Sequence, residues 1–405
     1  MTGGDRNSQL RDWRNKYVAL NQASLQWLLD RPALPGGWLN TKVNSLTLAD
    51  YGPDDGLRAP QFTYGWIQGR GLEALVTHAD YLQAEAPDLA ARAMDRARAL
   101  YDSLAALYAE YGNGYFLYDG ARIPVHMDAT GQAHRQLSGA GFATYSQAFM
   151  LKGLIAAAQR FDTPREATWR GHMQVLIADL EKGRFIQNER QPLDAAALAG
   201  ERENYGPRMI LLGAAALLQE LGHGSDAAFG NRFIDHVLNR HMDAKTHLLR
   251  DEPDGELCNP GHAIEFFGFA LDFVAADDPR IPQLLQGLQA SCEAGFHGPG
   301  IGIAVSVKTG AVLEPHFPWW TLPETIRATA LAYERNGDAR FIEFWHRADS
   351  AFWQNYLRSD APMAFQNRDW TGPVDRVPAT PDLDPLYHTG LSLLGAIRAV
   401  DRLTR

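Results

Sequence analysis

Apolar residues recur at three- and four-residue spacing over much of this chain, which is the pattern of amphipathic helices. Residues 143–161 carry one apolar stripe among small alanines. Residues 207–221 begin with proline and are followed by Gly222, which are usual start and stop signals of a helix. The same reasoning predicts three more long helices, at residues 261–274, 323–336 and 388–403.

Further helices are predicted between these, and strands are rare. One helix begins near Trp66, and shorter ones are expected at residues 89–111, 166–182, 227–242, 281–294 and 339–356. Only residues 114–118 and 301–307 have the character of short strands, in loops. Because no alternation of strand and helix runs through the chain, a doubly wound sheet or a (β/α)₈ barrel is not expected. The predicted class is all-α.

The predicted long helices start at regular intervals of roughly 55 to 75 residues. The positions near these starts are Arg70, Gln147, Arg208, His262, Glu324 and His388. Each interval holds a loop, a helix, a turn and a second helix, and stacked helical hairpins bury a continuous core only together. Six hairpins, about twelve helices, closed into a ring would form an (α/α)₆ toroidal barrel with its inner-helix starts at one end. We predict one such domain over residues 1–405, with short β-hairpins in its loops.

Composition narrows the class of partner and compartment. The net charge is −10 with acids and bases interspersed, so the basic stripe that nucleic-acid binding requires is missing. Cys258 and Cys292 have neither metal-site nor redox-motif spacing, which favours a reducing cytoplasm. The first residues lack the apolar core of a signal peptide, and no apolar run is long enough to span a membrane. A cytoplasmic monomer or homodimer without membrane contact is expected.

Candidate chemistry lies at the predicted helix starts. In Asn259-Pro260-Gly261-His262 the histidine stands three residues before Glu265, so both side chains share one helix face. An imidazole beside a carboxylate is suited to proton transfer near neutral pH. Glu324 and His388 stand at two later starts, and Trp319-Trp320 precedes the first of them. Together these groups indicate an acid/base enzyme that acts on a flat-faced polar molecule such as a sugar.

These motifs make the chain resemble the N-acylglucosamine 2-epimerase superfamily, which includes cellobiose 2-epimerases, mannose isomerases and sulfoquinovose isomerases. The stretch 259–265 looks like the N-P-G-H-x-x-E motif of the superfamily, and Trp319-Trp320 with Glu324 looks like its W-W-x-x-x-E motif. His388 lies where the superfamily has its second catalytic histidine. The resemblance implies an (α/α)₆ barrel that interconverts aldoses with their 2-epimers or with ketoses.

Other positions match the superfamily only in part. Trp66 and Arg70 look like its substrate-contacting pair on the first inner helix, and Asn204 has a counterpart in its N-x-x-M-H-x-x-E-A segment. That segment then departs, because Arg208 and Leu211 stand in place of the histidine and the glutamate. The residues before His388, at 382–387, also differ from the Lys-Gly-rich approach common in the superfamily. The resemblance therefore supports the chemistry better than it identifies the sugar.

The predicted site and mechanism follow. The catalytic candidates are His262, His388, Glu265 and Glu324, and the substrate-binding candidates are Arg70, Trp66, Asn204, Arg208, Trp320 and Tyr115. We expect His388 to exchange the proton on C2 of the sugar, with His262 as the complementary acid or base. Return of the proton to C1 gives an aldose–ketose isomerase, and its return to the other face of C2 gives a 2-epimerase.

The changed positions favour an isomerase for a free monosaccharide of the mannose/fructose type, because they remove contacts expected for disaccharide or amide substrates. No metal and no organic cofactor is expected, since the carbonyl of the substrate is itself the activating group. A glycoside hydrolase or lyase on the same barrel would instead use two carboxylates, from Glu265, Glu324 and Asp128, and would leave the histidines without a role. A catalytically silent sugar-binding barrel is the third possibility.

Overall fold

The computed structural model describes residues 3–136, 141–376 and 380–405. They form two compact units, which are treated separately below. The first unit comprises Met1–Ser24, Asn204–Val377 and His388–Arg405, and the second comprises Leu25–Glu203 and Pro378–Tyr387. Within the described ranges, no helix is both long and apolar enough to cross a membrane.

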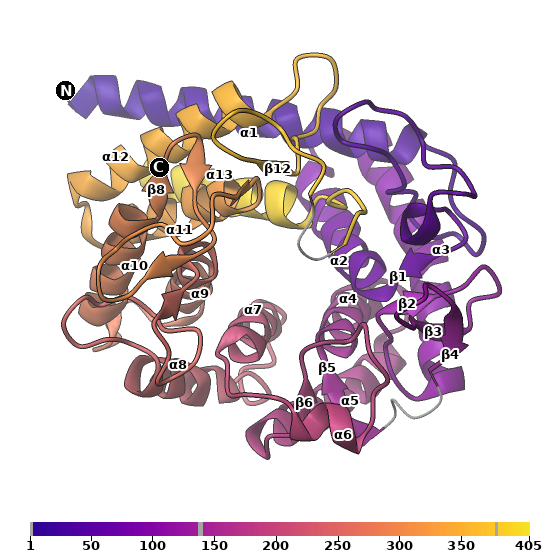
Figure 1. The fold of residues 1–405 in the computed structure, drawn as a ribbon. Helices are drawn as coiled ribbons and strands as arrows, with labels where there is room; N and C mark the ends of the chain where they lie inside the picture. The colour runs from indigo at the N-terminus through magenta and orange to yellow at the C-terminus, as the bar shows by residue number, and fades with distance from the viewer. Residues whose placement is uncertain (1–2, 137–140, 377–379) are drawn as a thin grey trace. The chain divides into compact units, whose positions relative to one another are not determined.

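Helices of the first unit alternate between two layers (Figure 1). In chain order they are α1 (Gly3–Asp30), α7 (Gly206–Glu220), α8 (Phe229–Arg240), α9 (Pro260–Phe273), α10 (Ile281–Gly295), α11 (Thr321–Asn336), α12 (Ala339–Ala351) and α13 (Ser392–Leu403). Helix α7 packs on α9, α9 on α11, and α11 on α13. Each of α8, α10 and α12 folds back on the helix before it. This is the alternation expected of stacked helical hairpins.

Helix α1 is an element that the sequence analysis did not predict. Its residues up to Ser24 belong to the first unit, where Trp13 lies 4.9 Å from Trp345 of α12, ring centroid to ring centroid. The Tyr17 hydroxyl donates to Asp349 at 3.0 Å, and the Lys16 ammonium lies 2.6 Å from the same carboxylate. The apolar residues of α1 keep helical spacing, but many charged residues stand between them, which obscures the pattern in the sequence.

The second unit has the same hairpin alternation and most of the β-structure. Its helices are α2 (Gly65–Leu82), α3 (Pro87–Tyr111), α4 (Tyr145–Phe161), α5 (Thr163–Glu181) and α6 (Ala195–Ala199). Helix α2 packs on α4, while α3 and α5 fold back on α2 and α4 respectively. Four antiparallel strands form a sheet in the order β1 (Thr63–Tyr64), β2 (Leu117–Tyr118), β3 (Pro124–Met127) and β4 (Ala133–Arg135). Strand β5 (Ala143–Thr144) pairs in parallel with β6 (Phe185–Ile186).

Short strand pairs stand in the loops of the first unit. They are β7 (Leu257–Cys258) with β10 (Val305–Ser306), β8 (Phe296–His297) with β9 (Gly300–Ile301), and β11 (Phe317–Pro318) with β12 (Asn367–Arg368). The prediction of one strand over 301–307 was wrong, because the two ends of this run pair with different partners. The predicted strand at 114–118 narrows to β2.

The start of the last helix also differs from its prediction. Residues Tyr387–Leu391 form a π-helical turn, and the α-helix begins only at Ser392. In the first unit the Asn21 side chain donates to the Gly390 carbonyl at 3.0 Å, so this carbonyl has a partner outside the turn. Such wide turns are frequent at functional sites. Here the turn includes His388.

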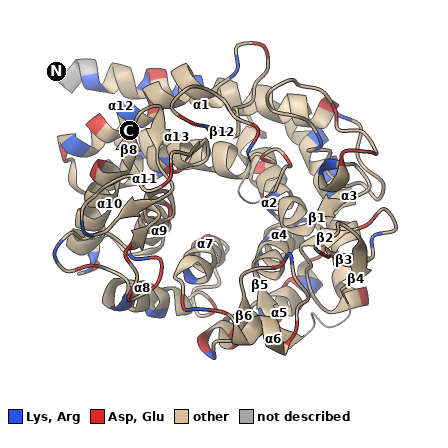
Figure 2. Ribbon diagram, in the orientation of Figure 1, with Lys and Arg blue, Asp and Glu red and all other residues tan. Residues whose placement is uncertain are grey.

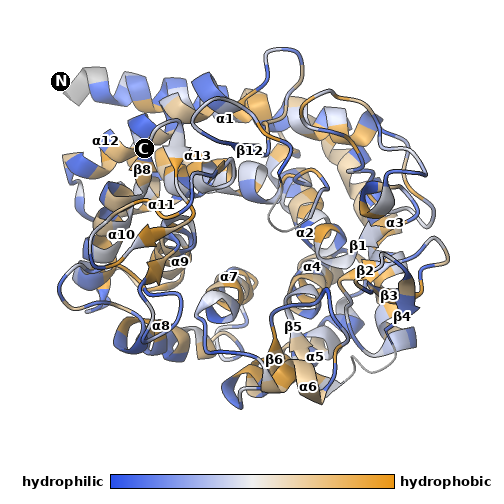
Figure 3. Ribbon diagram, viewed as in Figure 1, coloured by the Kyte–Doolittle hydropathy of each residue, from blue (hydrophilic) through white to orange (hydrophobic). Residues whose placement is uncertain are grey.

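The distribution of charge and hydropathy agrees with the sequence analysis. Blue and red residues are interspersed along the elements of both units, and no described element carries a basic stripe (Figure 2). Helix α8 shows hydrophobic and hydrophilic sides (Figure 3), and its buried side consists of Phe229, Phe233, Ile234, Val237 and Leu238 with Gly230.

Glu189 of the second unit gives the fold a testable pH dependence. Its carboxylate accepts a hydrogen bond from the Ser146 backbone N–H at 2.9 Å, at the start of α4. Burial raises the pKa of Glu189 to about 7, although hydrogen bonds from Ser146 and Thr144 act in the opposite direction. A carboxyl whose pKa is higher in the folded state stabilises the fold at acidic pH, and this stabilisation is lost as the pH rises through about 7.

We therefore expect Glu189→Gln, which is neutral at every pH, to be more stable than the wild type at pH 8. The expected gain is about 1–3 kcal/mol, from a pKa difference of about two units. At pH 4.5 the two proteins should have nearly equal stability. Urea unfolding at both pH values measures the difference, with exposed Glu181→Gln as the control. An equal difference at both pH values would contradict the assignment.

Candidate active site

The first turn of α9 presents His262 and Glu265. Asn259 caps this helix, because its side-chain oxygen accepts from the His262 backbone N–H at 3.1 Å. Pro260 occupies the first helical position, where its missing N–H costs nothing. The Asn259 backbone N–H in turn donates to Asp251 at 3.0 Å. Local sequence thus fixes where α9 begins and places Glu265, only 1% exposed, three residues after the histidine.

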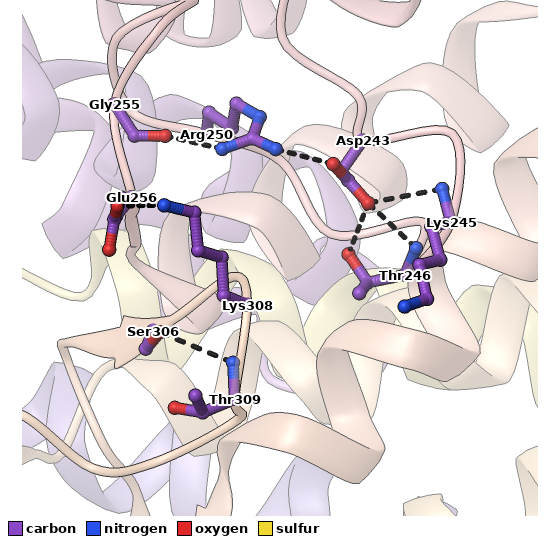
Figure 4. A network of polar contacts seen from close by, with 9 residues as sticks. All are labelled: Asp243, Lys245, Thr246, Arg250, Gly255, Glu256, Ser306, Lys308 and Thr309. Atoms are coloured by element: carbon purple, nitrogen blue, oxygen red, sulfur yellow. Dashed lines mark hydrogen bonds and ion pairs between the residues drawn. The ribbon is translucent and has the colours of Figure 1, made fainter.

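A polar network braces the loop before this turn (Figure 4). Arg250 donates to the Gly255 carbonyl at 2.5 Å and pairs with Asp243. Asp243 also accepts from the backbone N–H groups of residues 245 and 246. Glu256 pairs with Lys308 of the facing hairpin, and β7 pairs with β10 beside it. The segment that carries Asn259 is therefore held from both sides.

The start of α11 lies directly against the first turn of α9. A Cβ atom at Gly261 would lie 2.6 Å from Thr321 Cγ2 and 2.8 Å from Trp320 Cη2, so only glycine allows this approach. The Trp320 ring stacks on His262, with centroids 5.2 Å apart and planes at 28°. The same ring lies 5.5 Å from the His388 ring, at 36°. One indole therefore contacts both histidines that the sequence analysis singled out.

Glu324 links His388 to a third charged group. Its Oε1 lies 3.0 Å from His388 Nδ1, and its Oε2 lies 2.5 Å from Arg327 Nη2. Glu324 is 1% exposed and His388 is 7% exposed. Burial by itself would raise the pKa of Glu324, but the Arg327 charge and the His388 hydrogen bond outweigh it and hold this pKa below its ordinary value. Glu324 is thus an ionised acceptor.

The ionised carboxylate determines the tautomer of the neutral imidazole. Because a carboxylate only accepts hydrogen bonds, His388 Nδ1 must carry the hydrogen in this contact. The lone pair of the neutral ring is then on Nε2. Trp319 supports the same ring, since it packs edge-on against His388 at 6.3 Å and its Nε1 donates to Thr389 at 3.3 Å. The arrangement prepares Nε2 as a base.

Three of these groups have the spacing of a cation site. One ligand atom from each of Glu265, Glu324 and His388 lies within 4.8 Å of the others. Carboxylate oxygens and imidazole nitrogens are ligands that divalent zinc or manganese accepts. Arg327 already supplies positive charge to Glu324, which is the service that a cation would perform there. The expectation of a metal-free site stays a prediction.

In the second unit the predicted pair Trp66 and Arg70 lies in an aromatic cluster. The guanidinium carbon of Arg70 is 3.9 Å from the Phe149 ring centroid and 5.1 Å from those of Trp66 and Tyr387. Lys152 lies beside it, 3.1 Å from the Tyr387 hydroxyl and 2.9 Å from Glu73. Burial would lower the pKa of Lys152, yet Glu73 and Tyr387 outweigh it and raise this pKa.

The remaining candidates are not brought into either cluster by a described contact. Tyr115 of the second unit is buried and packs edge-on against Tyr118 at 6.3 Å. In the first unit the Asn204 side-chain oxygen accepts from the Gly206 backbone N–H at 2.7 Å, at the start of α7. The Arg208 guanidinium carbon lies 5.8 Å from the Phe233 ring centroid. The substrate contacts expected of these three residues, and of Arg70 and Trp66, stay predictions.

Comparison with solved structures identifies the fold. The chain is similar to a sugar epimerase from a ruminal bacterium and to the cellobiose 2-epimerase from Bacillus thermoamylovorans, each at 15% identity and a TM-score of 0.70. Both matches cover 97% of this chain, and 98% and 99% of the other chains. A D-mannose isomerase matches at 13% identity and a TM-score of 0.67, over 96% of this chain and 97% of its own. These likenesses confirm the predicted (α/α)₆ barrel class.

Comparison of sequences identifies the family. None of the curated proteins matches this chain. Residues 139–391, more than half of the chain, match the N-acylglucosamine 2-epimerase family. This range contains the Asn259-to-Glu265 turn, Glu324 and His388, which carried the resemblance in the sequence. The chain therefore belongs to the N-acylglucosamine 2-epimerase family and is an enzyme of the sugar epimerase and isomerase kind.

Proposed function

We propose that this protein is an aldose–ketose isomerase for a free monosaccharide of the mannose/fructose type, working through an enediol. The observation that carries the proposal is the contact between His388 Nδ1 and Glu324 Oε1 at 3.0 Å. It supports a neutral His388 whose Nε2 accepts a proton at working pH. Trp320, which lies against both His388 and His262, supports assigning the two imidazoles to one reaction.

The proposed reaction starts from the open-chain aldose. His388 Nε2 takes the proton from C2, the C2–H electron pair forms the C1–C2 double bond, and His262 gives a proton to the carbonyl oxygen on C1. The product of this step is an enediol. Removal of the proton from the C2 hydroxyl and delivery of a proton to C1 then give the ketose. The histidines act as acid and base in turn, and each contributes a factor of about 10²–10⁴.

A 2-epimerase is the second candidate, because the same enediol is shared by both reactions. Delivery of the proton to the opposite face of C2, in place of C1, restores an aldose with inverted configuration. The similarity to a cellobiose 2-epimerase and to a D-mannose isomerase supports both outcomes. The absence of the family histidine and glutamate at Arg208 and Leu211 favours the isomerase.

Solvent deuterium separates these reactions. The protein is incubated in D₂O with mannose, glucose, lyxose, talose or cellobiose, and the products are analysed by NMR. Deuterium on C1 of a new ketose is the expected result, and deuterium on C2 of a new aldose would assign the 2-epimerase. Release of a new reducing end from oligosaccharides without exchange would replace both proposals with hydrolysis. No exchange and no cleavage with any sugar would contradict enzyme function at this site.

We also expect the activity to be unchanged after dialysis against EDTA, because Arg327 supplies the positive charge at Glu324 and the carbonyl needs no Lewis acid in this scheme. The measurement is kcat/KM before and after dialysis, with and without added zinc or manganese. Loss of activity that either metal restores would assign Glu265, Glu324 and His388 as ligands.

A further inference from the structure

Arg327 is a buried charge that the proposed proton transfers do not use directly. It stands on α11, one turn after Glu324, and its side chain is only 10% exposed. An Arg three residues after a Glu on a helix is usually a weak surface ion pair. Here the carboxylate partner is 2% exposed, and its second oxygen already bonds His388. The pair is part of a buried row Arg327–Glu324–His388.

The neighbouring helices are built around this arginine. A Cβ atom at Gly395 of α13 would lie 3.0 Å from Arg327 Cγ, and one at Gly268 of α9 would lie 3.5 Å from Arg327 Nη2. Phe269 of α9 has its ring centroid 4.1 Å from the guanidinium carbon. Two glycines and one aromatic ring, on two different helices, therefore leave room for the guanidinium beside Glu324.

The charges around His388 show what this arginine changes. Glu265 of α9 and Glu324 of α11 both have a carboxylate oxygen within 4.8 Å of a His388 nitrogen. His262 of α9 faces His388 only across Trp320, and the Ser392 hydroxyl of α13 bonds Glu324. Without Arg327, two carboxylates would surround the imidazole and favour its protonated form. Arg327 cancels one of these two negative charges.

We propose that Arg327 is a positioning residue that keeps His388 in its neutral, proton-accepting form at neutral pH, by neutralising Glu324 and fixing its orientation. This inference rests on the proposed function only for its kinetic test, because the protonation of His388 is measurable in a protein without substrate. The effect is electrostatic, so it is carried by the charge of residue 327. Lysine at this position should preserve most of it, and methionine should not.

The kinetic test compares Arg327→Met and Arg327→Lys with the wild type, using the sugar that the wild type converts. The acidic limb of kcat/KM reports the protonation of the essential base in the free enzyme. In Arg327→Met this limb should move to higher pH by about one unit or more, so activity falls about tenfold at neutral pH and recovers in alkaline buffer. Arg327→Lys should keep the wild-type limb. An unmoved limb in Arg327→Met overturns the proposal.

A structural role alone is tested by Arg335→Met on the same helix. Arg335 donates to the backbone carbonyls of Leu271 and Val274, at 2.7 and 2.8 Å, and lies eight residues beyond Arg327, which is about 12 Å along the helix. Its loss should lower stability without moving the limb. If Arg335→Met moves the limb as far as Arg327→Met does, the effect is general loosening and the proposal is wrong.

An NMR titration separates this proposal from the proposed function. The ring signal of His388 is assigned in histidine-labelled protein by its disappearance in His388→Asn. Its titration midpoint should lie higher in Arg327→Met than in the wild type, whether or not any sugar is converted. If Arg327→Met does not fold, Glu324→Gln is compared with Glu324→Gln/Arg327→Met. The double variant must then have the higher midpoint, and equal midpoints overturn the proposal.

Discussion

Replacing His388 with asparagine lowers kcat/KM by about 10²–10⁴-fold, the usual contribution of a general base, while the fold stays intact. Asparagine retains an amide N–H close to the position of Nδ1, so Glu324 keeps a donor in place of the contact at 3.0 Å. It has no atom equivalent to Nε2, so the proton on C2 has no acceptor. The two functions of the imidazole, orientation and proton transfer, are thereby separated.

The measurement is the rate of sugar conversion together with deuterium exchange at C2 and the circular dichroism spectrum. His247→Asn is the matched control, because His247 has a positive φ of 60°, a conformation that asparagine tolerates, and its ring bonds only an exposed glutamine among the contacts described. This control should keep full activity. If His388→Asn retains more than about a tenth of the wild-type rate, His388 is not the base.

Local sequence was sufficient to predict the α9 half of the site. Asparagine as a cap, proline at the first position and a glycine are each read from neighbouring residues, and α9 begins where they indicate. The reason for Gly261 was not in the local sequence. It depends on the contact with Trp320 and Thr321, some sixty residues further along the chain.

The His388 half depended on long-range information. The repeat of helix starts correctly indicated that Glu324 and His388 each stand at the start of a helix, and their contact spans 64 residues. Which atoms meet could not be read from the pattern, because a π-helical turn replaces the first turn of the expected helix. Arg327 was missed for a related reason: its burial is created by glycines on α9 and α13, and a Glu-x-x-Arg pair on one helix resembles an exposed ion pair.

The segment before His388 acquires a structural explanation. In the sequence, residues 382–387 were only a departure from the superfamily. In the second unit Asp382 accepts from the Thr41 hydroxyl at 2.8 Å, and the Leu383 backbone N–H donates to the Thr41 carbonyl at 3.1 Å. Asp384 accepts from the Tyr387 backbone N–H at 2.9 Å. The acidic residues that replace the expected pattern therefore tie this segment to residues 41 and 42 and shape its final turn.

Lys42→Met should lower the free energy of unfolding by about 3–5 kcal/mol, the usual cost of removing one partner of a buried ion pair. The Lys42 ammonium lies 2.7 Å from Asp382, and the two side chains are 2% and 0% exposed. The ammonium also lies 4.8 Å from the Tyr64 ring centroid. Methionine fills a similar volume, so the loss reports the Asp382 charge left without its cation in a buried position.

Urea unfolding measures this change, and two further variants show its origin. Arg160→Met removes one partner of the exposed Arg160–Asp80 pair of the same unit, and should cost less than about 1 kcal/mol. Lys42→Met combined with Asp382→Leu removes both buried charges and should recover much of the lost stability, because no uncompensated charge remains. If the double variant is less stable than Lys42→Met alone, then the hydrogen bonds of Asp382 to residue 41 stabilise this segment more than its charge does.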